Sequence, residues 1–119
     1  RLKTDYIDLY QLHWPNRGSY HFRAYWDYLP KTQDKARYQE EMIEIVETLS
    51  ELKNAGLIRE VGVSNETCWG VMKLNNVIKQ YSNLSIASIQ NEYSLMCRLF
   101  DNDFITIFYG LKTLWTIYI

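Results

Sequence analysis

Cysteine is scarce in this sequence, and the two cysteines present, Cys68 and Cys97, stand far apart and outside any CxxC pair. Structural metal sites and disulfide frameworks need several cysteines, or cysteines with histidines, at short and regular spacings. The sequence therefore predicts neither a metal site nor a disulfide-stapled fold. So few cysteines fit a reducing compartment, and we expect a cytoplasmic protein.

An excess of charge is also lacking, since 13 Lys and Arg stand against 14 Asp and Glu and give a formal net charge of -1. The basic residues are scattered along the chain and form no positively charged stripe. The attraction that draws proteins to nucleic acid or to an anionic membrane is therefore missing. We expect neither nucleic acid nor a membrane as a partner.

Long apolar runs are absent too. The most apolar stretch, residues 104–119, is too short for a membrane span and is interrupted by Lys112. The chain opens at Arg1 without an initiator Met, an apolar signal region or a cleavage site. We interpret it as an internal part of a longer sequence.

What the sequence does contain is ordinary globular material, with 47% hydrophobic and 23% charged residues in 119 positions. This composition argues against disorder, and the length suits one modest domain but not two. Ten Tyr and four Trp raise the aromatic content to 15%. Such side chains can line a pocket or simply fill a large core, and composition leaves both open.

Hydrophobic periodicity divides the chain into alternating elements. Residues 16–38 are polar and aromatic without periodicity, which is typical of a functional or a disordered loop. Gly56 stands where the C-cap of a helix belongs. The expected elements are a strand over 6–13, an amphipathic helix over 39–55, a strand over 57–64, a helix from about 65–67 to 81, and a strand over 86–90.

This order of strand, helix, strand, helix, strand predicts an α/β fold with a parallel sheet and helices packed outside it. Pattern alone leaves two architectures open, an open doubly wound sheet and a closed eight-stranded barrel. In both, the side chains that carry chemistry gather at the carboxyl ends of the strands.

Polar residues follow all three expected strands: His13, then Ser64 with Asn65, then Gln90 with Asn91. Each has a purely structural alternative, because Asn65 could cap a helix, His13 could be an edge histidine, and Gln90 could bind loop backbone. Agreement of three strand ends favours a polar ligand site at one rim of the sheet. The residues alone support no more specific function.

Three longer motifs resemble those of the aldo-keto reductase superfamily. Residues 2–15 (LKTDYIDLYQLHWP) are similar to its fourth strand, 55–67 (AGLIREVGVSNET) to its fifth strand, and 89–95 (IQNEYSL) to its sixth strand and the following loop. The long insert before residue 38 and the Asn-Glu-Thr ending are most like the bacterial Tas-type branch. The motifs occur in the family's order and separation over residues 2–103.

The resemblance implies a partial (β/α)8 barrel and the reduction of aldehydes and ketones by hydride from NADPH. It implies that His13 helps to orient and polarise the carbonyl of a small substrate. It also implies that Ser64, Asn65 and Gln90 hold the nicotinamide carboxamide. Trp14 would lie near the substrate mouth.

The family's other catalytic residues, an Asp, a Tyr that acts as general acid and a Lys, belong to earlier strands and match nothing in this sequence. We therefore expect an oxidoreductase fragment that is inactive alone and that self-associates through open barrel edges. Two alternatives are a non-catalytic interaction module and a decayed, frameshifted gene product. His21 matches no family motif, and we expect it to be exposed.

The family pattern stops after Asp103, so we divide the chain into a partial barrel, residues 1–103, and an aberrant apolar tail, residues 104–119. A helix with a polar face should follow in the family, and then a strand bearing a Tyr that stacks on the nicotinamide. Tyr118 falls about where that Tyr would stand. Because the segment before it lacks a polar face, a frameshift or a truncated reading frame explains the tail more simply.

Overall fold

The computed structural model describes residues 3–17, 34–98, 101 and 114–118. In these ranges the chain forms an α/β fold in which strands and helices alternate, as the sequence predicts. The elements are β1 (Ile7–Leu12), α1 (Lys35–Asn54), β2 (Ile58–Ser64), α2 (Cys68–Ile78), β3 (Ile86–Glu92) and β4 (Leu114–Tyr118).

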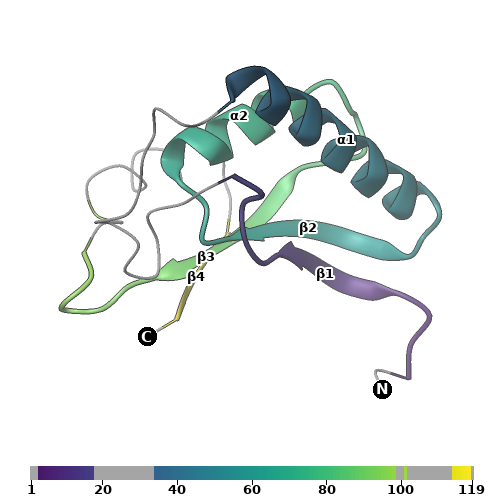
Figure 1. The fold of residues 1–119 in the computed structure, drawn as a ribbon. Helices are drawn as coiled ribbons and strands as arrows, with labels where there is room; N and C mark the ends of the chain where they lie inside the picture. The colour runs from purple at the N-terminus through teal and green to yellow at the C-terminus, as the bar shows by residue number, and fades with distance from the viewer. Residues whose placement is uncertain (1–2, 18–33, 99–100, 102–113, 119) are drawn as a thin grey trace.

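The strands form one four-stranded sheet in the order β1-β2-β3-β4, and every neighbouring pair is parallel. Both helices lie on the same face of this sheet, above it in Figure 1. Because all strands run in one direction, their carboxyl ends meet at a single edge. The expected parallel sheet with outer helices is confirmed.

Helix α1 begins at Lys35, earlier than the predicted start at 39, so the expected loop over 16–38 is too long at its far end. Asp34 caps the helix, and its side chain accepts hydrogen bonds from the backbone N–H groups of Ala36 and Arg37. Residues 18–33 of the predicted loop lie outside the described residues, as does His21. At the other end Gly56 adopts a φ of 73°, a conformation that glycine tolerates best, so the predicted helix end is confirmed.

The core lies between the helices and the sheet. Helices α1 and α2 and strands β2 and β3 each contribute at least one aliphatic side chain that is almost completely buried. These side chains include Val46 of α1, Val61 of β2, Val71 of α2 and Ile89 of β3. Their spacing follows the three- and four-residue steps of the helices and the two-residue step of the strands. Burial of this apolar layer fixes the register of the strands, and with it the position of their polar ends.

The predicted apolar tail contributes strand β4. Residues 102–113 lie outside the described residues, and Leu114–Tyr118 pairs with β3 so that Thr116 stands opposite Gln90 and Tyr118 opposite Glu92. Sequence analysis assigned no element to these residues. No helix within the described ranges is long and apolar enough to cross a membrane.

Candidate functional site

The polar residues predicted at the strand ends form one rim of the sheet. Ser64 on β2 stands in register with Gln90 on β3, and His13 immediately follows the last residue of β1. Successive residues of a strand point to opposite faces, so Ser64 and Gln90 lie on the same face as Gly62 and Ser88 two residues earlier. Buried Val63 and Ile89 point to the other face, toward the helices. Ser64 and Gln90 therefore belong to the face of the sheet that no helix of the described residues covers.

Asn65 ties the three strand ends together. Its side-chain Nδ2 donates to the backbone oxygen of His13 at 2.8 Å and to the Ser64 hydroxyl oxygen at 3.1 Å. Its backbone N–H donates to the carbonyl of Gln90 at 2.9 Å. Asn65 is 1% exposed and has a φ of 55°, which asparagine accepts more readily than most residues.

Asn65 is not a helix cap, so that alternative is wrong. The N-cap of α2 is Thr67, whose hydroxyl accepts from the backbone N–H of Gly70 at 3.1 Å. The side-chain amide of Asn65 instead donates hydrogen bonds to two neighbours at the rim, His13 and Ser64. Its position explains how the ends of β1, β2 and β3 keep a fixed spacing.

Two side chains at the rim keep their hydrogen-bonding groups available. The imidazole of His13 is exposed, and the amide of Gln90 is half-buried. Within the described ranges, neither side chain has a hydrogen-bond partner. The Ser64 hydroxyl is buried and accepts from Asn65, which leaves its own hydrogen to donate. A neutral ligand with both donors and acceptors, such as an amide, matches these groups.

A second polar layer, which sequence analysis missed, lies directly beneath the rim. Gln11, Gly62 and Ser88 stand in register on β1, β2 and β3. The Gln11 amide donates to the Val63 carbonyl at 3.2 Å and to the Ser88 hydroxyl at 3.4 Å. A Cβ at Gly62 would clash with the Ser88 hydroxyl and lie 3.3 Å from Gln11. The glycine inside the predicted strand was the available signal for this close approach.

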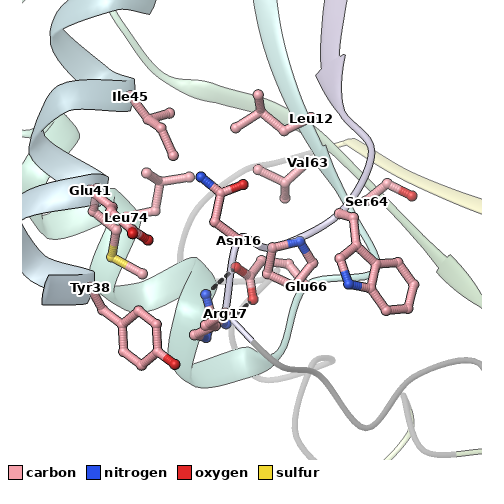
Figure 2. Close-up of a pocket in the computed structure, with 13 residues that line it drawn as sticks. Leu12, Asn16, Arg17, Tyr38, Glu41, Ile45, Val63, Ser64, Glu66 and Leu74 are labelled. Carbon is pink, nitrogen blue, oxygen red and sulfur yellow. Dashed lines mark hydrogen bonds and ion pairs between the residues drawn. The ribbon is translucent and has the colours of Figure 1, made fainter. Parts of the chain in front are cut away.

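A cavity of about 70 Å³ lies beside the rim, between the sheet and the two helices (Figure 2). Its lining comes from the segment after β1, from α1, from the end of β2 and from α2. The lining includes Leu12, Trp14, Asn16, Arg17, Tyr38, Ile45, Val63, Ser64, Glu66 and Leu74. Trp14 is 37% exposed and belongs to this lining together with Ser64. In the described part of the chain, no three His, Cys, Asp or Glu side chains are placed to hold a metal ion.

Comparison with known proteins decides the family. A sequence model described as "Aldo/keto reductase family" matches residues 1–109. The chain belongs to this family. It is 38% identical over 105 residues to Protein tas of Escherichia coli (strain K12), covering 85% of this chain and 28% of that protein. It is 37% identical over 105 residues to the aldo-keto reductase of Babesia bovis, covering 82% of this chain and 35% of that protein.

A third relative, aldo-keto reductase YhdN of Bacillus subtilis (strain 168), is 33% identical over 116 residues, which is 92% of this chain and 28% of YhdN. The chain thus spans about a third or less of the length of these relatives. The resemblance inferred from the motifs, including the Tas-like branch, is confirmed. The parallel sheet with outer helices is accordingly part of a (β/α)8 barrel. The family match also extends to residue 109, past the boundary that we predict at 103.

Proposed function

We propose that this chain supplies the carbonyl-binding histidine and the nicotinamide-binding rim of an NADPH-dependent reductase of aldehydes and ketones. The observation that carries the proposal is the rim itself, where Ser64 and Gln90 lie in register on one face and Asn65 holds the backbone of His13 beside them. Side chains at the carboxyl ends of barrel strands are where barrel enzymes place their chemistry. We also propose a cytoplasmic protein, because both cysteines are free.

The rim suits the carboxamide of a nicotinamide. A carboxamide presents one acceptor oxygen and an NH2 donor, and Gln90 offers the complementary pair. The Ser64 hydroxyl offers a further donor, and Asn65 holds that hydroxyl in place. When bound, NADPH supplies the hydride that reduces the carbonyl carbon. The task of these residues is to fix which face of the nicotinamide meets the substrate.

His13 lies at the end of β1, the strand next to the one that ends in Ser64, and we place the approaching substrate carbonyl beside it. A neutral imidazole can donate one hydrogen bond to a carbonyl oxygen and so draw electron density from the carbon. The imidazole is exposed, but Asn65 donates a hydrogen bond to the backbone oxygen of His13 and so fixes the backbone from which the ring extends. This arrangement lets the His13 ring meet a substrate while Asn65 keeps its backbone beside the nicotinamide site.

The proton that completes the reduction must come from elsewhere in the barrel. The Asp, Tyr and Lys of the family pattern match no residue of these 119 positions. Absence of a positioned proton donor lowers the rate by about 10²- to 10⁴-fold. We expect the 119 residues by themselves to reduce carbonyls no faster than background.

Grafting provides a direct test. Residues 3–98 of this chain would replace the matching stretch of the Babesia bovis aldo-keto reductase, and NADPH consumption with an aromatic aldehyde would be followed by absorbance. We expect turnover by the graft, and a loss of about 10²- to 10³-fold on His13→Ala, because one donor to the carbonyl oxygen is removed.

The matched control is His21→Ala, which removes a histidine outside every family motif and should leave turnover unchanged. A graft in which His13→Ala turns over as fast as the parent, with both variants folded, would contradict the assigned role. A graft that folds and binds NADPH but reduces no aldehyde would remove support for the proposed reaction.

A non-catalytic interaction module is the second candidate, favoured by the sheet face that no described helix covers (Figure 1). Such a module would bind a partner in a defined ratio without NADPH. Native mass spectrometry of the chain in the presence and absence of NADPH separates the two functions.

A further inference from the structure

The segment after β1 is fastened to the turn before α2 by a buried ion pair. Arg17 and Glu66 have side chains only 6% and 8% exposed. The Arg17 guanidinium makes two parallel contacts to the Glu66 carboxylate, one of them at 2.7 Å between NH1 and Oε1 (Figure 2). It also donates to the Thr67 hydroxyl at 3.1 Å. The planar guanidinium fits a carboxylate in this two-pronged way, whereas a lysine ammonium does not.

Neighbouring groups bind both members of the pair and leave space for them. The Glu66 carboxylate also accepts from the backbone N–H of Thr67 at 2.6 Å, and the Glu66 carbonyl accepts from Asn91 Nδ2 at 2.9 Å. A Cβ at Gly70 would clash with both charged groups of the pair, so only glycine leaves room for them there. Arg17 also lies over the ring of Trp69, 5.1 Å from its centre. Glu66 is thus held by partners other than Arg17 as well.

Together with Asn65, the pair anchors a short span of chain, residues 13–17, at both ends. The backbone oxygen of His13 is held by Asn65, and Arg17 is held by Glu66, the next residue of the same turn. Trp14 lies between these two anchors and, like Arg17, lines the cavity beside the rim. The backbone that carries its indole is therefore tied, on both sides, to the turn that follows Ser64.

We propose that Arg17 and Glu66 are a positioning pair that holds Trp14 at the mouth of the carbonyl site and so sets the KM for the carbonyl substrate. This inference rests on the proposed function. We assign neither residue a contact with substrate or nicotinamide; both act through the chain from His13 to Arg17. Stability alone does not explain a buried ion pair, because replacing such a pair with apolar residues of similar size often leaves a protein equally or more stable.

The test uses Arg17→Lys and Glu66→Gln, which keep size and disrupt the two-pronged contact. In the active graft described above, we expect each to raise the carbonyl KM by about tenfold or more, the loss of one well-placed contact. The Kd for NADPH should stay within about twofold of the parent. Arg37→Lys is the control, because Arg37 forms an exposed ion pair with Glu41 at 2.7 Å.

A merely structural role gives a different result. A smaller folded fraction lowers kcat in proportion and leaves KM alone, so each variant would be scored against its folded fraction from a thermal melt. An unchanged carbonyl KM in Arg17→Lys, or a loss confined to kcat and accounted for by unfolding, overturns the proposal.

A readout that needs no activity separates this inference from the proposed function. The folded graft would be labelled with fluorotryptophan, and the Trp14 resonance assigned from Trp14→Phe. We expect that resonance to shift or broaden in Arg17→Lys and Glu66→Gln but not in Arg37→Lys. Should the parent graft be inactive, the proposed function fails, and an unchanged Trp14 resonance would overturn the positioning pair as well.

Discussion

At the scale of single residues, the sequence predicts which residues lie at the rim better than it predicts what each one does there. His13, Ser64 and Gln90 could be predicted because each ends an apolar run, and parallel strands bring such ends together. The structure places them on one rim, while their roles toward a cofactor stay predictions. Asn65 lies at this rim too, its role toward a cofactor also stays a prediction, and its alternative as a helix cap was wrong. The cap lies two residues later because the backbone at Asn65 is left-handed and points its amide back at the rim.

Other residue roles depend on pairing over long distances in the chain. Arg17 meets Glu66 across 49 positions, and Gln11 meets Ser88 across 77. The sequence around these residues does not reveal that they pair, because a polar or charged side chain in a loop or strand is usually exposed to solvent. Only the register of the sheet brings them together.

Gly62 provides the prediction at this scale. In the folded graft, Gly62→Ala should lower the free energy of unfolding by about 1–3 kcal/mol, because the new methyl group overpacks the Ser88 hydroxyl. Urea unfolding would measure the change. In the Ser88→Ala background the same substitution should cost clearly less, because the clashing oxygen is gone. Equal costs in both backgrounds would show that the contact with Ser88 is unimportant.

At the scale of elements, the sequence located the strands well and the helix boundaries less well. Strands β1 and β2 lie within one residue or so of the predicted ranges, because alternation and turn residues mark their ends. The start of α1 was missed because its first turn presents polar residues outward and lacks the apolar spacing that signals a helix. Asp34, followed by the pair Arg37 and Glu41, was the usable signal.

The turn after α1 gives the prediction for elements. At φ 73°, with open space around it, Gly56 tests backbone strain without a packing contribution. In the folded graft, Gly56→Ala should lower the free energy of unfolding by about 1 kcal/mol, and Gly56→Asn by clearly less, because asparagine visits the left-handed region more easily. Urea unfolding midpoints of the two variants would be compared. If alanine is tolerated as well as asparagine, backbone strain does not govern this turn.

For the whole molecule, the sheet has helices on one face and ends at β1 on one side within the described residues. An edge strand that exposes its backbone groups can pair with another chain. Leu9 on this strand is 41% exposed, which adds apolar surface to the edge. Self-association was predicted from the sequence, and it stays a prediction, as do the division at residue 103 and the frameshifted origin of the tail.

We therefore expect the 119-residue chain to form oligomers as its concentration rises, and to melt without a sharp transition. Light scattering after size exclusion would measure its mass. Leu9→Lys should shift the population toward monomer by placing charge on the edge strand. Leu57→Lys is the control, since Leu57 is 47% exposed and lies outside β1. A monomer with a sharp cooperative melt would contradict the expectation of an open barrel edge.

The central claim is that the rim holds a nicotinamide, and Gln90 tests it most directly. The Kd for NADPH would be measured by fluorescence for the folded graft and its Gln90→Ala and Gln80→Ala variants, the latter removing an exposed glutamine outside the rim. Loss of the amide's hydrogen bonds to the carboxamide should weaken binding by about tenfold in Gln90→Ala, and Gln80→Ala should bind like the parent. Equal affinity in all three proteins would contradict the assignment of this rim to the cofactor.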